Sequence, residues 1–360
     1  MHRATEAALF SAALLLSRGI VACDQHNPAP AEPAKPKLSA LAAPIATSPP
    51  QKTIADPVDP NRPMLIDQEE RVRPSVGSWI TARPGFQSSR STAARGGIEP
   101  CAQQPIDTSA FEDWAPVSRG KFIAPRALTL DESGGFDLII HLLGDEPIRR
   151  ELIASEQPFA LYSMTAGQNQ GYASLFTGTQ FQASIVAGVE QAVSKRLGKP
   201  AHVRHLAMSA WSAGFVGIEA ALSQPAGKDI DAVILIDGLH APRNNDLQFK
   251  AQMKPFVDFA ALAARGERAF FVSHSSIDPP DFASTTECAH YVISTLGGKP
   301  EPVRRTDRFG LDLVEFFQKG DFQVRGYAGN DRADHCAQLA VLRDAFTALG
   351  KRWKAQPLSH

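Results

Sequence analysis

The chain has 360 residues, 43% of them hydrophobic, and a formal net charge of -1, with 37 basic against 38 acidic side chains. This length suits one large domain or two ordinary ones, and the apolar fraction is enough to form a substantial core. The balanced charge gives no electrostatic case for nucleic acid as the main ligand, so we expect no nucleic-acid partner.

The N-terminus has the features of an export signal. A short basic start precedes an apolar run at 7–16, which is too short to span a bilayer but suits a secretory signal. Residues 20–23 read Ile-Val-Ala-Cys and resemble a bacterial lipobox, which implies lipidation of Cys23. A plainly cleaved signal and a chance apolar start are the alternatives. Residues 1–23 therefore predict a protein of the cell envelope, either anchored to the membrane by a lipid or secreted.

The next part of the chain, residues 24–63, is predicted to be a tether. From Asn27 to Pro63 it is rich in Pro and Ala, a composition that cannot bury enough apolar surface to offset the entropy lost on ordering. We expect an extended spacer between the anchor and the folded part. Residues 64–120 lack a clear period and predict an irregular N-terminal extension of the domain, with a strand at 78–82.

From residue 121 onward, strands and helices alternate. The predicted strands are 121–124, 127–130, 136–143, 159–163, 202–208, 232–236, 269–272 and 322–327. The predicted helices are 181–197, 212–222, 246–264, 284–296 and 336–349. This alternation predicts one α/β domain over residues 121–360, with a mostly parallel central sheet and helices on both faces. We expect no large cap domain, because the loop between residues 236 and 246 is short.

A candidate nucleophile follows the strand 202–208, at the kind of strand end where open parallel sheets place their sites. The chain there reads Ser209-Ala-Trp-Ser-Ala-Gly and opens into a helix. This resembles the nucleophile elbow of α/β-hydrolases, a small-x-Ser-x-Gly turn with a strained serine, although Ala210 replaces the commoner Gly. The resemblance implies that Ser212 is the nucleophile. A serine that merely caps a helix is the alternative, and Ser209 lacks the Gly two residues on.

The same resemblance implies a histidine base after the last strand and an acid earlier in the chain. His335 follows the strand 322–327 and stands where the base is expected. The acid must orient the imidazole and stabilise its cation, and three carboxylates are candidates. Asp237 directly follows a strand, Asp278 lies in the loop after the next strand, and Glu287 falls within the following helix. Asp237 is preferred because the loop that carries Asp278 contains two prolines.

An oxyanion hole of two backbone amides completes the site that the resemblance implies. One amide is that of Ala213, and the other comes from the turn after the strand 136–143, where Leu142 and Leu143 are the candidates. The implied activity is that of an esterase-like serine hydrolase that cleaves an ester or amide through an acyl-enzyme, without a metal or organic cofactor. The substrate would be a small molecule or an acyl group borne on a polymer.

Two other interpretations stay open. The departures at Ala210, Leu142 and Leu143 allow a non-catalytic surface binding protein with the same fold. A metal-dependent hydrolase is the other interpretation, since several histidines that end or follow strands could gather at one edge of the sheet with nearby aspartates. These histidines are His141, His240, His274 and His335.

The chain has four cysteines, Cys23, Cys101, Cys288 and Cys336. With Cys23 assigned to the lipid, at most one intrachain bridge forms. Cys288 and Cys336 belong to the last two strand–helix units, which should be neighbours, so an oxidising compartment would permit a disulfide between them. Two unpaired thiols are the alternative. Because no Cys-x-x-Cys pair exists, we expect no thiolate zinc site.

Overall fold

The structure is a computed structural model that describes residues 107–166, 169–178, 180–330 and 332–355. The predicted signal, the tether, the strand at 78–82, and Cys23 and Cys101 lie outside these residues. Within the described ranges, no helix combines the length and the apolar character needed to cross a membrane.

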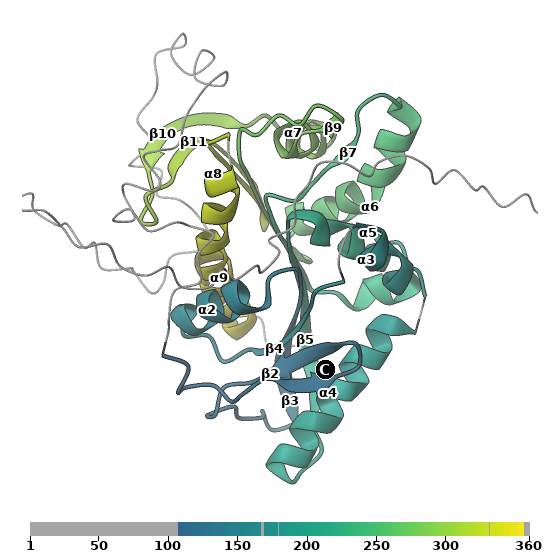
Figure 1. Cartoon of the computed structure of the whole chain (residues 1–360), viewed down its shortest axis with the longest axis vertical. Coiled ribbons are helices and arrows are strands. Elements are labelled where there is room, and N and C mark those ends of the chain that lie inside the picture. The colour runs from purple at the N-terminus through teal and green to yellow at the C-terminus, as the bar shows by residue number, and fades with distance from the viewer. Residues whose placement is uncertain (1–106, 167–168, 179, 331, 356–360) are drawn as a thin grey trace, which may run out of the picture. The chain divides into compact units, whose positions relative to one another are not determined.

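A ten-stranded sheet forms the centre of the described domain (Figure 1). Its strands are β1 (Ala115–Val117), β2 (Gly120–Ile123), β3 (Gly135–Leu142), β4 (Ala160–Met164), β5 (His202–Trp211), β6 (Ala232–Ile236), β8 (Ala269–His274), β10 (Glu301–Thr306), β11 (Asp312–Lys319) and β12 (Phe322–Tyr327). The spatial order is β1-β2-β4-β3-β5-β6-β8-β12-β11-β10. The six strands from β4 to β12 run parallel, and an antiparallel pair extends the sheet at each edge.

Helices cover both faces of this sheet. They are α2 (Asp145–Ser155), α3 (Asn169–Phe176), α4 (Phe181–Leu197), α5 (Phe215–Leu222), α6 (Asp246–Ala264), α7 (Thr285–Thr295), α8 (Arg332–Ala337) and α9 (Leu342–Ala355). Buried side chains of α3 to α7 form one apolar core with Leu138 and Ile140 of β3, whereas Ile139 belongs to a second core with α2 and α9. Successive residues of a strand point to opposite faces, which explains this division. Figure 1 shows α2 and α9 together on the face opposite α4, α5 and α6.

The fold class predicted from the sequence is confirmed: the domain has a mostly parallel central sheet with helices on both faces. After β6 the chain forms only the short strand β7 (Ala241–Pro242), paired with β9 (Phe282–Ala283), before α6 begins. This segment is too short for a large cap. Helix α6 has the predicted bounds because Asn245 caps it, its side chain accepting a hydrogen bond from the Gln248 amide at 3.0 Å.

Three local predictions differ from the structure. The segment 127–130 is no strand, and β1 pairs with β2 instead, so the sheet begins before residue 121. The helix predicted at 336–349 is divided into α8, a short 3-10 turn and α9. The antiparallel strands β10, at the sheet edge, and β11, beside it, were not predicted, because their partly exposed residues give a mixed rather than an apolar pattern.

The parallel strands end at one edge of the sheet. Leu142 of β3 lies opposite Ala210 of β5, Trp211 lies opposite Ile236 of β6, and Ile236 lies opposite Ser273 of β8. The residues that follow these strands are therefore neighbours, and they include the predicted nucleophile and the preferred acid.

Candidate active site

Ser212 stands in a sharp turn between β5 and α5. Its backbone φ is 51°, in the left-handed region that residues with a side chain seldom adopt and that costs about 1–3 kcal/mol. Two glycines allow the close packing around this turn. A Cβ atom on Gly214 would lie 2.4 Å from the Leu142 carbonyl oxygen, and one on Gly238 would lie 2.4 Å from the Ser212 carbonyl oxygen. The glycine of the small-x-Ser-x-Gly pattern is thus required by contact with β3.

His335 and Asp237 form a hydrogen-bonded pair beyond the same sheet edge. Nδ1 of His335 lies 2.7 Å from Oδ2 of Asp237, which is only 1% exposed. The other carboxylate oxygen, Oδ1, accepts from the Ser275 amide at 2.7 Å and from the Thr285 hydroxyl at 3.0 Å. The Asp237 carboxylate is therefore fixed on both oxygens, and it fixes the imidazole in turn.

The charge state of Asp237 follows from these contacts. Burial raises its pKa, but the hydrogen bond and charge of His335 and the hydrogen bonds of Ser275 outweigh burial and lower the pKa to about 2. Asp237 is thus ionised at neutral pH and can only accept hydrogen bonds. The proton shared by the pair must then lie on Nδ1, so in the neutral imidazole the lone pair is on Nε2.

Trp211 connects the His335 pair to the turn that carries Ser212. Its ring stacks on the His335 imidazole with centroids 4.8 Å apart and planes at 28°. Its Nε1 donates to the His335 backbone carbonyl at 3.2 Å. Because Trp211 directly precedes Ser212, the stack holds His335 beside the turn.

The two alternative acids are engaged elsewhere. Asp278, with a side chain 75% exposed, pairs with Arg243. Glu287 accepts from Arg243 at 2.8 Å and forms a capping box with Ser284 at the start of α7. Of the three candidate acids, all within the described residues, Asp237 is the one bonded to His335.

His141 and Ser209 hold the turn after β3, where the sequence predicts an oxyanion donor. Nδ1 of the fully buried His141 lies 2.7 Å from the Ser209 hydroxyl, and Nε2 lies 2.7 Å from the Leu143 carbonyl oxygen. Burial lowers the pKa of His141 to about 4, so the ring is neutral at pH 7. Because a carbonyl only accepts, Nε2 carries the proton and Nδ1 accepts from Ser209. Ser209 is thus a structural residue of this turn.

The backbone amides of this turn are not arranged as the sequence prediction of an oxyanion donor at Leu142 or Leu143 requires. Leu143 has a φ of 75°, but its amide already donates to the Met164 carbonyl at 3.0 Å, so it is not free to bind an oxyanion. Leu142 lies within β3, between β4 and β5. Gly144 follows with a φ of 104° and begins α2. Ala213 forms part of the short 3-10 turn that leads into α5.

The histidines considered as a metal set have separate partners. His141 contacts Ser209 and Leu143, and His335 contacts Asp237. Nδ1 of His240 lies 3.1 Å from the Ala283 carbonyl oxygen, and burial lowers its pKa to about 4. His274 instead contacts Glu315. Among the described residues, the grouping of three possible metal ligands that the structure has includes only His274 of these four.

The predicted disulfide between Cys288 and Cys336 is wrong. Cys288 is a free, buried thiol whose pKa is raised to about 12 by burial, whereas Cys336 is disulfide-bonded. The physical reason is the sheet between them. Cys288 belongs to the core formed with α3 to α7, and Ala337, the neighbour of Cys336, belongs to the core on the opposite face.

Sequence reasoning missed several residues that hold the site together. Gly238 supports Ser212, and Ser275 and Thr285 support Asp237. Ser275 stands in a loop and Thr285 at a helix start, where nothing in the sequence marks their roles. Trp211 occupies the x position before the serine in the small-x-Ser-x-Gly pattern, so the pattern does not indicate its role. A signal for Gly238 existed in its position directly after a candidate acid at a strand end.

A comparison with protein-family models gave no match, and neither did a comparison with curated proteins. Similar solved structures include the enterobactin esterase FES from Shigella flexneri, with 12% identity and a TM-score of 0.43 over 72% of this chain and 63% of that chain. Est1E from Butyrivibrio proteoclasticus has 13% identity and a TM-score of 0.32 over 66% of this chain and 96% of its own. A puromycin-hydrolyzing peptidase from Mycobacterium tuberculosis has 12% identity and a TM-score of 0.35 over 64% of this chain and 37% of its own. The chain spans less than two thirds of the FES chain, and at such values these likenesses add no argument about activity.

Proposed function

We propose that this protein is a serine hydrolase that cleaves an ester or amide bond through an acyl-enzyme. One observation carries the proposal: the 2.7 Å pair of His335 with the buried, ionised Asp237 lies beyond the same sheet edge as the strained Ser212. A left-handed serine and a buried acid each cost stability, so their occurrence together favours a chemical role.

In the proposed reaction, Nε2 of His335 accepts the Ser212 hydroxyl proton as Oγ attacks the substrate carbonyl carbon. Asp237 holds the ring in the tautomer that leaves Nε2 free, and it stabilises the imidazolium that forms. The tetrahedral intermediate collapses, the leaving group takes the proton from His335, and an acyl ester on Ser212 remains. Water then attacks this ester, with His335 again accepting and returning one proton.

Stabilisation of the oxyanion is assigned to two backbone amides. Ala213 supplies the first, as the residue after the nucleophile. The turn at 142–144 supplies the second, and we assign it to Gly144 because the Leu143 amide is bonded to Met164. The buried His141 fixes this turn by its hydrogen bond to Leu143, so it acts as a positioning residue.

The proposed location is the cell envelope. The apolar start and the lipobox-like residues 20–23 support export and lipidation of Cys23, and the Pro- and Ala-rich residues 24–63 support a tether. The segment between β6 and α6 is too short to form a large cap. A bulky or polymer-borne acyl group is therefore included among the proposed substrates.

The test is a hydrolysis screen with the purified chain on p-nitrophenyl esters and amides of increasing acyl length. We expect turnover of at least one ester by the wild type and a loss of about 10⁴-fold or more in Ser212→Ala. The control is Ser223→Ala, which changes a serine at the exposed end of α5 and should leave turnover unchanged. Equal turnover by Ser212→Ala would contradict the proposal and favour a non-catalytic binding protein.

A further inference from the structure

A second cluster of chemically competent side chains takes no part in the proposed reaction. His274, His290 and Glu315 each offer one ligand atom, and these three atoms lie within 4.8 Å of one another. Oε1 of Glu315 lies 2.9 Å from Nε2 of His274 and 2.7 Å from Nε2 of His290. Two imidazoles and one carboxylate are a donor set typical of zinc sites.

The backbone of the sheet builds this cluster. His274 of β8 and Glu315 of β11 both lie opposite Gly326 of the intervening strand β12. Strands two positions apart are separated by about 10 Å, so the two side chains must reach across β12 to meet. They can do so only because Gly326 has no side chain. A Cβ atom there would lie 2.3 Å from Cγ of Glu315 and 2.5 Å from Cε1 of His274.

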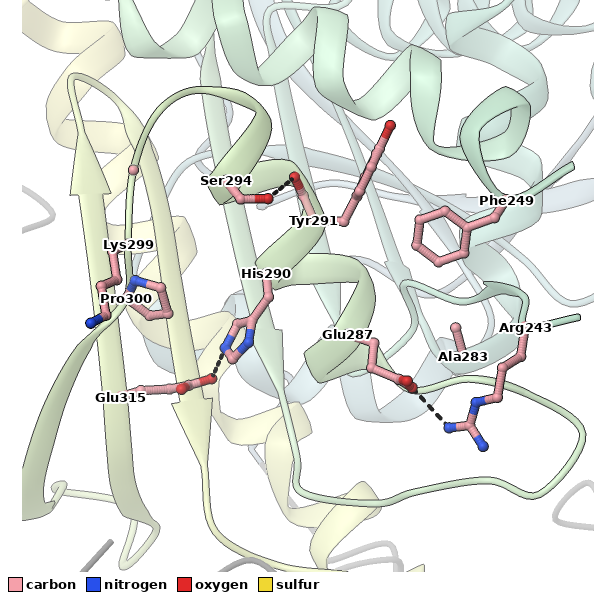
Figure 2. Close-up of a pocket in the computed structure, with 11 residues that line it drawn as sticks. Arg243, Phe249, Ala283, Glu287, His290, Tyr291, Ser294, Lys299, Pro300 and Glu315 are labelled. Carbon is pink, nitrogen blue, oxygen red and sulfur yellow. Dashed lines mark hydrogen bonds and ion pairs between the residues drawn. The ribbon is translucent and has the colours of Figure 1, made fainter. Parts of the chain in front are cut away.

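The third residue, His290, approaches from α7 and closes the cluster on the solvent side. Figure 2 shows its ring directed at Glu315, both in the wall of a pocket of about 700 Å³. The side chains of His274 and Glu315 are 2% and 5% exposed, whereas that of His290 is 33% exposed. Two ligands are thus buried, and the third faces a pocket from which water can supply a fourth.

Hydrogen bonds fix the tautomer of His274. Its Nδ1 lies 3.0 Å from the Thr286 hydroxyl and 3.2 Å from the Ser275 carbonyl oxygen. The Thr286 hydroxyl donates to that same carbonyl at 2.9 Å, so both oxygens can only accept from Nδ1. Nδ1 therefore carries a proton, as in metal-bound histidines whose other nitrogen is held by a carbonyl.

This arrangement leaves a buried nitrogen without a hydrogen bond. Nε2 of His274 faces the Glu315 carboxylate at 2.9 Å, yet among the described residues it makes no hydrogen bond of acceptable geometry. In the neutral ring Nε2 has a lone pair, which would face the carboxylate oxygen with no proton between them. A second proton on the ring, which makes the contact an ion pair, or a metal ion bound to both atoms removes this conflict.

We propose that His274, His290 and Glu315 bind a divalent transition-metal ion, with Zn²⁺ the best match to the donor set. Ligand atoms that lie about 2.1 Å from a tetrahedral ion lie about 3.4 Å from one another. The Glu315 oxygen lies 2.7 and 2.9 Å from the two ring nitrogens, so each of these separations must widen by about 0.5–0.7 Å when an ion binds. The side chain of His290 is partly exposed, so it can move to the distance from the ion that binding requires. The metal would join β8, β11 and α7, and this inference does not depend on the proposed hydrolase reaction.

The experiment uses the full chain, stripped of metal with a chelator and titrated with ZnCl₂ in a calorimeter. We expect one equivalent to bind and the unfolding midpoint to rise with Zn²⁺. His290→Ala should lower the affinity by more than about 100-fold, and Thr286→Val by about 10–100-fold, because it removes the hydroxyl that contacts Nδ1 of His274. His202→Ala, an exposed histidine elsewhere, is the matched control and should bind as the wild type does.

The absence of stoichiometric binding, or unchanged binding in His290→Ala, would overturn the proposal. Unfolding curves recorded in chelator show whether His290→Ala folds. If it does not fold, the wild type titrated with Co²⁺ decides the matter, since three protein ligands and a water give the visible absorption of tetrahedral Co²⁺. An octahedral spectrum, or none, would overturn the site. None of these results depends on Ser212, so failure here is distinct from failure of the proposed hydrolase activity.

Discussion

Nδ1 of His335 lies 2.7 Å from Oδ2 of Asp237, although 98 residues separate the two in the sequence. Two features make this contact: β6 and β12 end at the same sheet edge, and Trp211 stacks on the imidazole. Ser275 and Thr285 hold the other oxygen of the carboxylate. The pair is thus positioned from three separate segments of the chain.

Replacement of the acid tests this assignment. Asp237→Asn should lower kcat by about 10³–10⁴-fold, because an amide in that position favours the wrong imidazole tautomer and removes the charge that stabilises the imidazolium. Steady-state kinetics on an ester that the wild type hydrolyses provide the measurement. Asp278→Asn is the matched control, since Asp278 pairs with Arg243, and its activity should stay within about twofold of the wild type. A large loss of kcat in Asp278→Asn with little loss in Asp237→Asn would show that Asp278 is the acid.

Gly238 is predicted to be intolerant of any side chain. A methyl group there would lie 2.4 Å from the Ser212 carbonyl oxygen, so Gly238→Ala should displace the nucleophile turn and lower kcat/KM by about 100-fold or more. Gly178→Ala is the control, because its nearest neighbour would be 3.8 Å away. Kinetics and thermal unfolding of both variants would check this. Full activity of Gly238→Ala would mean that the packing beside Ser212 does not matter.

His141 should make stability depend on pH. Burial lowers its pKa from 6.5 to about 4, so between these values the unfolded chain binds a proton that the folded chain does not. Stability therefore falls as the pH falls from 6.5 towards 4, by up to about 3 kcal/mol from this residue. His240, whose pKa is also lowered to about 4 by burial, adds to the same trend.

Urea unfolding at pH 7, 5.5 and 4.5 measures this dependence. His141→Gln should be less stable than the wild type at pH 7, since its hydrogen bonds to Ser209 and Leu143 are impaired, by about 1–3 kcal/mol. Its loss of stability between pH 7 and 4.5 should be smaller than that of the wild type. An identical slope for the two proteins would show that His141 does not titrate as its burial requires.

The sequence predicts the parallel part of the fold, and the reasons are local. Central strands such as β6 and β12 are short apolar or mixed runs between clear turns, and α6 has an Asn cap. Ser212, Asp237 and His335 each directly follow or closely follow such strands. Their roles came from a family resemblance, and the structure adds the contact between two of them.

The remaining features depend on contacts between distant segments. The cluster of His274, His290 and Glu315 forms because Gly326 lies between His274 and Glu315. To predict it, one would need the register of β8, β12 and β11, and β11 was not predicted. The separation of Cys288 from Cys336 depends on which face each helix covers. The engagement of the Leu143 amide depends on the end of β4. No pattern within a window of the sequence contains this information.

The most direct test of the central claim is to locate the reactive serine. The purified chain is treated with a fluorophosphonate, which forms a covalent bond with an activated serine, and the modified peptide is identified by mass spectrometry. We predict one modification, at Ser212, that disappears in Ser212→Ala and slows strongly in Asp237→Asn. A folded wild-type protein that stays unmodified, or that is modified at another serine, would contradict the proposed mechanism.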